Sequence, residues 1–256
     1  MNRINMLFDR KKENIFSVYF TAGFPQLDDT VPTLKALQAN AVDLVEIGVP
    51  FSDPMADGIV IQNSSQQALK NGMSIRKLFS QLTDIRDHIH IPLVMMGYLN
   101  PIMQFGFEEF CAECSRVGVD GMIIPDLPMA DYLEEYKEIA ENYGLEFIFL
   151  ITPETSDERI RLIDSHTNAF IYMVSSAAVT GTQSSFDTKV DYFNRINAMN
   201  LKNPRLIGFG ISNKSTVDMV NKYSSGAIIG SAFIKALETT NDIDKGVELL
   251  LKKLSE

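Results

Sequence analysis

Two acidic side chains near one short apolar segment are the strongest candidates for chemistry in this chain. Glu46 lies near the end of the strand-like segment 42–47, and Asp57 follows in the next loop. A carboxyl group in an apolar cavity loses its hydration, which raises its pKa toward the range where it gives and takes protons near neutral pH. Two carboxyl groups in unlike surroundings can divide acid–base work. The alternative is that Glu46 is an exposed strand-end residue whose charge is satisfied by backbone amides.

Composition limits the possible functions. The chain has 256 residues, 45% of them hydrophobic, and a formal net charge of −10. This length suits one eight-unit α/β barrel or two smaller domains, and because no segment resembles a linker we expect one domain over residues 1–256. The negative charge argues against nucleic acids and anionic membranes as partners. The lack of a long apolar segment and of a signal-peptide core predicts a cytoplasmic protein.

Strand-like apolar segments alternate with helical patterns in which apolar residues recur every three or four positions, as at Leu133, Tyr136 and Ile139. Ser74 and Ser212 are candidate helix caps. This alternation predicts a single (β/α)8 TIM barrel, an α/β fold with parallel strands and extra short helices. An open doubly wound sheet is the alternative, but the first turn lacks its glycine pattern. The predicted strands are residues 15–21, 42–47, 91–96, 119–124, 145–151, 169–174, 205–208 and 226–229.

A barrel places its active site where the strands' carboxyl ends meet the following loops. His88, His90 and His166 precede strands, so a histidine-ligated metal is not expected. No lysine lies within a strand-like segment, which argues against a Schiff base. The side chains expected to converge at the carboxyl ends are acids and tyrosines, which favours acid–base chemistry. They are Glu46, Asp57, Tyr98, Asp126, Glu154 and Tyr172.

The two cysteines, Cys111 and Cys114, lie inside a helical pattern. A redox pair usually opens a helix directly after a strand, so we expect these residues to be structural.

Glycine-containing turns follow the last three predicted strands, at Gly181, at Gly208 and Gly210, and at Gly230 followed by Ser231. Glycine lets the backbone approach a ligand closely, and the amides at a helix start attract anions. Barrels bind phosphate after strands seven and eight. These turns therefore predict a phosphate-binding pocket despite the acidic composition.

Five segments together resemble the tryptophan synthase alpha subunit family, in order and over nearly the whole chain. They are residues 46–58, 125–128, 179–181, 208–212 and 230–231. The resemblance implies retro-aldol cleavage of indole-3-glycerol phosphate to indole and glyceraldehyde 3-phosphate, with no cofactor in this chain. It also implies an alpha2beta2 complex with a beta subunit that carries pyridoxal phosphate.

The resemblance also implies roles for single residues. Glu46 would shuttle protons between indole C3 and the glycerol hydroxyl, Asp57 would bond the indole N–H, and Tyr172 would lie near the glycerol part. The remaining implied site residues line the indole pocket or hold the phosphate. They are Tyr19, Met96 and Tyr98 for the pocket, and Gly181, Gly210, Gly230 and Ser231 for the phosphate.

Two loops would act as lids, residues 50–57 and 177–186, with Thr180 bonding Asp57 in the closed state. The chain departs from the common family pattern at Ser176 and Ala178, where many members have arginine and glycine, and this bears on the stiffness of the second lid. The resemblance places Pro50, Asp53, Asp126 and Pro128 against the beta subunit.

Two other functions stay open from the sequence. One is another phosphate-binding barrel enzyme, an isomerase or a ring-closing synthase, although the synthase would be expected to have a strand-end lysine. The other is a regulatory subunit without catalytic activity of its own. The presence of Glu46 and Asp57 argues against this alternative.

Overall fold

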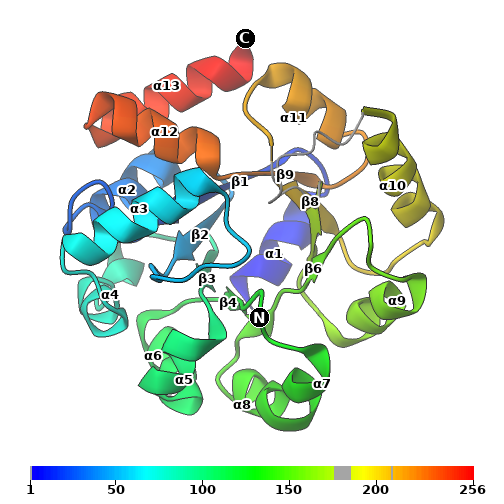
Figure 1. The fold of residues 1–256 in the computed structure, drawn as a ribbon, viewed down its shortest axis with the longest axis horizontal. Coiled ribbons are helices and arrows are strands. Elements are labelled where there is room, and N and C mark those ends of the chain that lie inside the picture. Colours follow the sequence, from blue (N-terminus) through cyan, green and yellow to red (C-terminus); the bar gives the residue numbers. More distant parts are fainter. Residues whose placement is uncertain (1, 176–185, 209) are drawn as a thin grey trace.

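The computed structural model describes residues 2–175, 186–208 and 210–256. Its strands are all parallel and form one sheet in the order β5-β4-β3-β2-β1-β9-β8-β7-β6 (Figure 1). They are β1 (Ile15–Thr21), β2 (Leu44–Gly48), β3 (Leu93–Met96), β4 (Gly121–Ile123), β5 (Glu146–Phe147), β6 (Leu150–Ile151), β7 (Ile171–Val174), β8 (Arg205–Gly208) and β9 (Gly226–Ile229).

The sheet closes because its two ends, β5 and β6, belong to one extended segment of chain. The amide of Ile148 donates to the carbonyl of Met122 at 3.0 Å, and the carbonyl of Phe149 accepts from the amide of Tyr172 at 3.0 Å. The predicted strand 145–151 is therefore divided in two, since it pairs first with β4 and then with β7. The predicted parallel barrel is confirmed.

Helices surround the strands on the outside of the barrel, except α1 (Arg3–Arg10), which lies across one end (Figure 1). The outer helices are α2 (Thr30–Ala39), α3 (Ile59–Lys70), α4 (Ile75–Gln81), α5 (Leu99–Phe105), α6 (Phe107–Val117), α7 (Met129–Asp131), α8 (Lys137–Asn142), α9 (Asp157–His166), α10 (Phe186–Ala198), α11 (Lys214–Val220), α12 (Ser231–Thr240) and α13 (Ile243–Ser255), with a short 3-10 helix η1 (Ile85–Asp87) and a π-helix η2 (Tyr132–Tyr136).

Side-chain caps start five of the described helices, α1, α4, α9, α11 and α13. The hydroxyl oxygen of Ser74 accepts the amide of Lys77 at the start of α4, as predicted. The prediction of Ser212 as the cap of α11 is wrong by one residue. Asn213 caps that helix because its side-chain oxygen accepts the amide of Thr216 while the Thr216 hydroxyl accepts the amide of Asn213.

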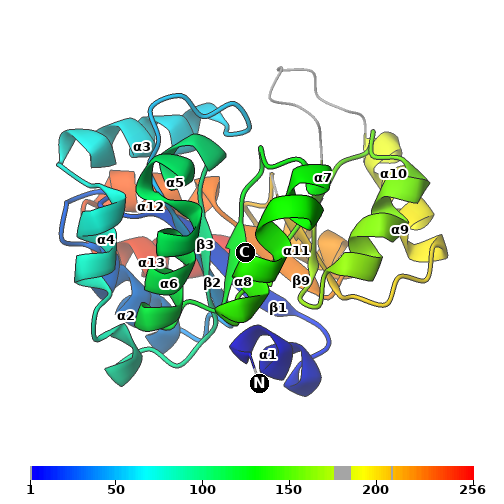
Figure 2. The same ribbon diagram turned by 90° about the horizontal axis from the view of Figure 1, so that it is seen from below.

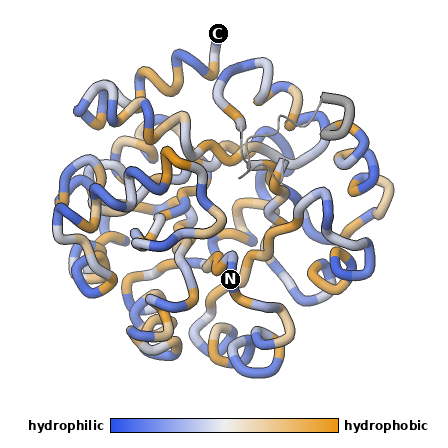
Figure 3. Tube along the Cα trace, viewed as in Figure 1, coloured by the Kyte–Doolittle hydropathy of each residue, from blue (hydrophilic) through white to orange (hydrophobic). Residues whose placement is uncertain are grey.

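Apolar strands covered on both faces form the core, and in Figure 3 the tube near the centre is mostly orange. Every residue of β2 is buried, including Glu46. Glu46 is paired in register with Tyr19 of β1. Because residues paired in register share one face of a sheet, both side chains point to the same side.

The helix α1 lies across the end of the barrel opposite the loop before α3 (Figure 2). Asp120 is buried there and bonds two arginines, Arg3 at 2.9 Å and Arg86 at 2.6 Å. This ion network stabilises the end of the barrel at which the strands begin. A functional site is therefore expected at the opposite end, where the strands finish.

Both cysteines are free and buried on α6. Burial raises the pKa of the Cys111 thiol to about 12, which disfavours the reactive thiolate. This supports the structural interpretation. None of the helices in the described part of the chain combines the length and the apolar character needed to cross a membrane.

Candidate active site

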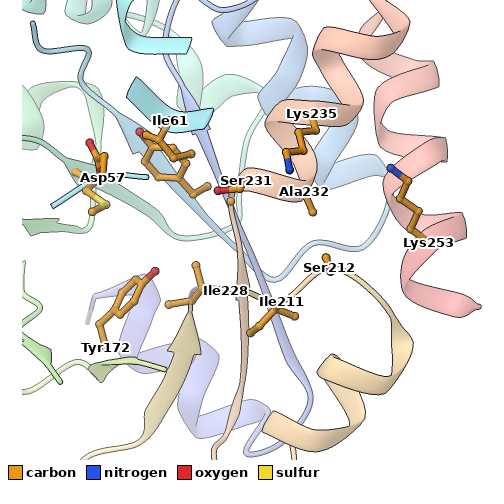
Figure 4. A pocket seen from close by; sticks show the side chains of 14 residues that line it. Asp57, Ile61, Tyr172, Ile211, Ser212, Ile228, Ser231, Ala232, Lys235 and Lys253 are labelled. Atoms are coloured by element: carbon orange, nitrogen blue, oxygen red, sulfur yellow. The ribbon is translucent and has the colours of Figure 1, made fainter. Parts of the chain in front are cut away.

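A cavity of about 450 Å³ opens at the carboxyl ends of the strands (Figure 4). Most of the predicted site residues line it, namely Tyr19, Asp57, Met96, Tyr172, Gly210, Gly230 and Ser231. Sequence reasoning missed several other lining side chains, among them Ile61, Ile228, Lys235 and Lys253. The cavity therefore brings together most of the predicted site residues and adds an apolar wall and a cationic rim that the sequence did not predict.

Glu46 does not line this cavity but lies fully buried beside it. Burial raises the pKa of its carboxyl group to about 8, and a hydrogen bond from the Ser17 hydroxyl opposes that rise. That bond is long, at 3.4 Å. The other carboxyl oxygen, Oε2, is buried and has no partner among the described residues. The alternative of an exposed, amide-satisfied strand-end residue is therefore wrong, and Glu46 is a neutral acid near pH 7.

Asp57 lies directly before Gly58, which precedes α3, and its carboxyl group faces the cavity. Burial raises its pKa to about 6, against a hydrogen bond from Tyr98. At neutral pH Asp57 is therefore ionised while Glu46 is protonated. The two carboxyl groups thus differ in protonation state at neutral pH, which is what a division of acid–base work between them would require.

Tyr98 lies next to the cavity and supports the loop of Asp57, although it is not one of the cavity's lining residues. Its hydroxyl oxygen accepts the amide of Ala56 at 3.0 Å, and its ring packs against Phe51 with centroids 5.4 Å apart. These contacts tie the segment before Asp57 to the end of β3.

Tyr19 and Tyr172 form aromatic walls of the cavity, and burial raises the pKa of both phenols. The charge of the Glu46 carboxyl group adds to the rise at Tyr172, so the two groups are near each other. Glycines make room for the rings. A Cβ at Gly48 would lie 2.1 Å from the Tyr19 hydroxyl, and one at Gly208 would lie 2.2 Å from the Tyr172 hydroxyl.

The predicted phosphate end lies at the start of α12. Gly230 precedes this helix and provides no side-chain cap. Its carbonyl accepts the amides of Phe233 and Ile234, at 2.9 and 3.1 Å. The earlier amides of the helix are therefore available to an anion. Gly210 has a φ of +76°, a conformation that favours glycine.

Several other residues singled out in the sequence lie outside the described part of the chain or do not line the cavity. Thr180 and Gly181 lie outside the described residues, as do Ser176 and Ala178. Asp126 accepts the amide of Leu99 at 2.9 Å, and Glu154 is exposed, so neither lines the cavity.

The histidines lie away from the carboxyl ends, with His166 ending α9 and His90 preceding β3. Within the described ranges, no three His, Cys, Asp or Glu side chains gather closely enough to hold a metal ion.

Comparison with known proteins agrees with this geometry. Residues 7–255 match the family model for the tryptophan synthase alpha chain. The alpha chain of Parabacteroides distasonis is 61% identical over 257 residues, which cover 100% of both chains. The solved tryptophan synthase A-subunit of Pyrococcus furiosus is 35% identical with a TM-score of 0.85, covering 95% of this chain and 98% of that one. A solved P. furiosus tryptophan synthase complex contains a chain that is 35% identical with a TM-score of 0.84, over the same shares. The chain described here belongs to the tryptophan synthase alpha chain family.

Proposed function

We propose that the cavity cleaves indole-3-glycerol phosphate to indole and glyceraldehyde 3-phosphate by carboxylate acid–base catalysis, without a metal ion or a Schiff base. Family membership supports the reaction. The observation that carries the mechanism is Glu46, a fully buried carboxyl group with a pKa of about 8 beside an apolar cavity. A group that titrates near neutral pH is suited to transfer protons in both directions.

The lining gives the substrate one orientation. The indole ring lies against Tyr19 and Met96, with its N–H donated to the ionised Asp57. The phosphate lies at the start of α12. There Ser231 offers its hydroxyl group, and the first turn of the helix offers free backbone amides. Tyr172 then flanks the glycerol part between the two ends.

The chemistry follows from this orientation. Protonation of indole C3 by Glu46 makes the ring an electron sink, and Asp57 stabilises the positive charge on the ring. As the carbon–carbon bond breaks, its electron pair returns to the ring and the glycerol hydroxyl loses its proton to Glu46. The glycerol part leaves as the aldehyde, and Glu46 ends protonated as it began. Because Glu46 does not line the cavity, its side chain turns from Ser17 toward the substrate, and only one long hydrogen bond resists that motion.

We further propose that this chain pairs with a beta subunit in an alpha2beta2 complex, and that the beta subunit holds pyridoxal phosphate. The similarity to a chain of the P. furiosus complex supports this pairing. Residues 50–57 would close over the substrate and transmit closure to the partner through Pro50, Asp53, Asp126 and Pro128. The exposed Met55 provides apolar surface in this loop.

The direct test is indole release from indole-3-glycerol phosphate by the purified chain, with and without a beta subunit. We expect release by the chain alone and faster release with the partner. No release from folded protein in either mixture would contradict the proposal and favour a regulatory subunit.

Asp57→Asn should lower kcat/KM by roughly 100- to 1000-fold, because it removes the negative charge that stabilises the indole cation. In the wild-type chain kcat/KM should rise with pH through about 6, as Asp57 ionises, and fall above about 8, as Glu46 loses its proton. The variant should lose the part of this rise that comes from Asp57 and keep only the part that comes from the second ionisation of the substrate phosphate, whose pKa is also about 6. Asp53→Asn, at an exposed position of the same loop, is the control and should leave the isolated chain unchanged. An unaltered acidic limb in Asp57→Asn would contradict the assignment.

A further inference from the structure

The cavity has two ends of opposite charge. Its only charged lining residues in the described part of the chain are Asp57 and two lysines, Lys235 of α12 and Lys253 of α13. Figure 4 shows Asp57 on one side and both lysines on the other, beyond Ser231. Such a cavity favours a ligand with a cationic or N–H-donating end and an anionic end.

The position of Lys235 follows from helix geometry. Ser231 and Lys235 lie one turn apart on α12, so both are on the same face. Side chains in a helix lean toward its amino terminus. The Lys235 ammonium group therefore approaches the free amides at the start of α12, and Figure 4 shows its nitrogen turned toward Ser231.

Lys253 reaches the same rim from another helix. It lies in the last turn of α13, which packs against α12. The ammonium groups of Lys235 and Lys253 form no ion pair or hydrogen bond with a described residue, whereas the ammonium group of neighbouring Lys252 pairs with Glu256 at 3.7 Å. Two unpaired ammonium groups at one rim repel each other, and an anion between them relieves that repulsion.

We propose that Lys235 and Lys253, called here the lysine pair, neutralise the substrate phosphate and select its dianionic form. The proposal rests on the proposed function. A helix start offers about half of one positive charge, whereas a phosphate monoester carries up to two negative charges above its second pKa of about 6. The chain's net charge of −10 repels any anion. The lysine pair supplies the local charge that the glycine turns lack.

The test compares Lys235→Met, Lys253→Met and the double variant with wild type. Because both lysines are exposed, each contributes modestly. We expect the KM for indole-3-glycerol phosphate to rise roughly threefold to tenfold in each single variant and roughly 30-fold in the double variant. The kcat should stay within about twofold, since proton transfer takes place at the other end. Lys235→Arg should retain a near-wild-type KM, and Lys252→Met is the matched control on α13.

Calorimetric binding separates this proposal from the function itself. Glycerol 3-phosphate should bind the wild-type chain more tightly at pH 7.5 than at pH 5, and the double variant should lose most of that gain. Binding of indole, a neutral probe of the other end, should be unchanged. Wild-type affinity for glycerol 3-phosphate in the double variant would overturn the lysine proposal, as would an equal loss of indole binding. If the wild-type chain cleaves no indole-3-glycerol phosphate, the proposed function fails, while the phosphate measurement still decides the role of the lysine pair.

Discussion

Glu46→Gln should lower kcat for indole release by roughly 1000-fold or more. Acid–base groups typically contribute 100- to 10,000-fold, and Glu46 is proposed to act both as the acid at indole C3 and as the base at the glycerol hydroxyl. Glutamine keeps the shape and the hydrogen bond from Ser17 but carries no transferable proton. Because Glu46 does not line the cavity, the KM should change by less than about threefold. Steady-state kinetics of the isolated chain provides both numbers.

The control for this prediction is Glu154→Gln, an exposed acid after β6 that does not line the cavity. It should retain wild-type kinetics. Glu46→Gln should still bind glycerol 3-phosphate and the beta subunit normally, which shows that the fold is intact. If Glu46→Gln kept more than about a tenth of the wild-type kcat, Glu46 would not be the proton carrier.

The burial of Glu46 could be predicted from local sequence because a continuous apolar run marks a buried strand. Glu46 lies among apolar residues in β2, and such a run predicts a strand covered on both faces. The glycines at the strand ends likewise predicted part of the cavity, since Gly210 and Gly230 line it. The register between β1 and β2 could not be predicted from local sequence, because the pairing of Glu46 with Tyr19 depends on how the two strands align across the sheet.

Features that depend on tertiary packing were missed. Tyr98 was predicted to line the pocket, but its hydroxyl group turns to the loop amide of Ala56. Lys235 lies on a helix, outside the strand segments where a Schiff-base lysine is expected, and only its one-turn spacing from Ser231 in the sequence indicates that it reaches the cavity. Lys253 gave no such signal, since its position depends on how α13 packs against α12.

The same buried proton predicts that the stability of Glu46→Gln relative to wild type increases as pH rises. The unfolded chain releases the Glu46 proton above about pH 4.5, whereas the native chain holds it up to about pH 8. Between these values the native state binds more protons, so the stability of the wild type falls as pH rises. Glutamine does not titrate, so this loss is absent from the variant.

The window from pH 6 to pH 8 isolates Glu46, because Asp57 has a pKa of about 6 in the native state and contributes mainly below that value. At about 1.4 kcal/mol for each pKa unit, the stability advantage of Glu46→Gln over wild type should grow by roughly 2 to 3 kcal/mol across this window. Urea denaturation of both proteins at the two pH values measures the change, and Glu154→Gln should show none. A constant difference between Glu46→Gln and wild type would mean that Glu46 is already ionised in the native state at pH 6. The group that donates a proton to indole would then have to be another residue.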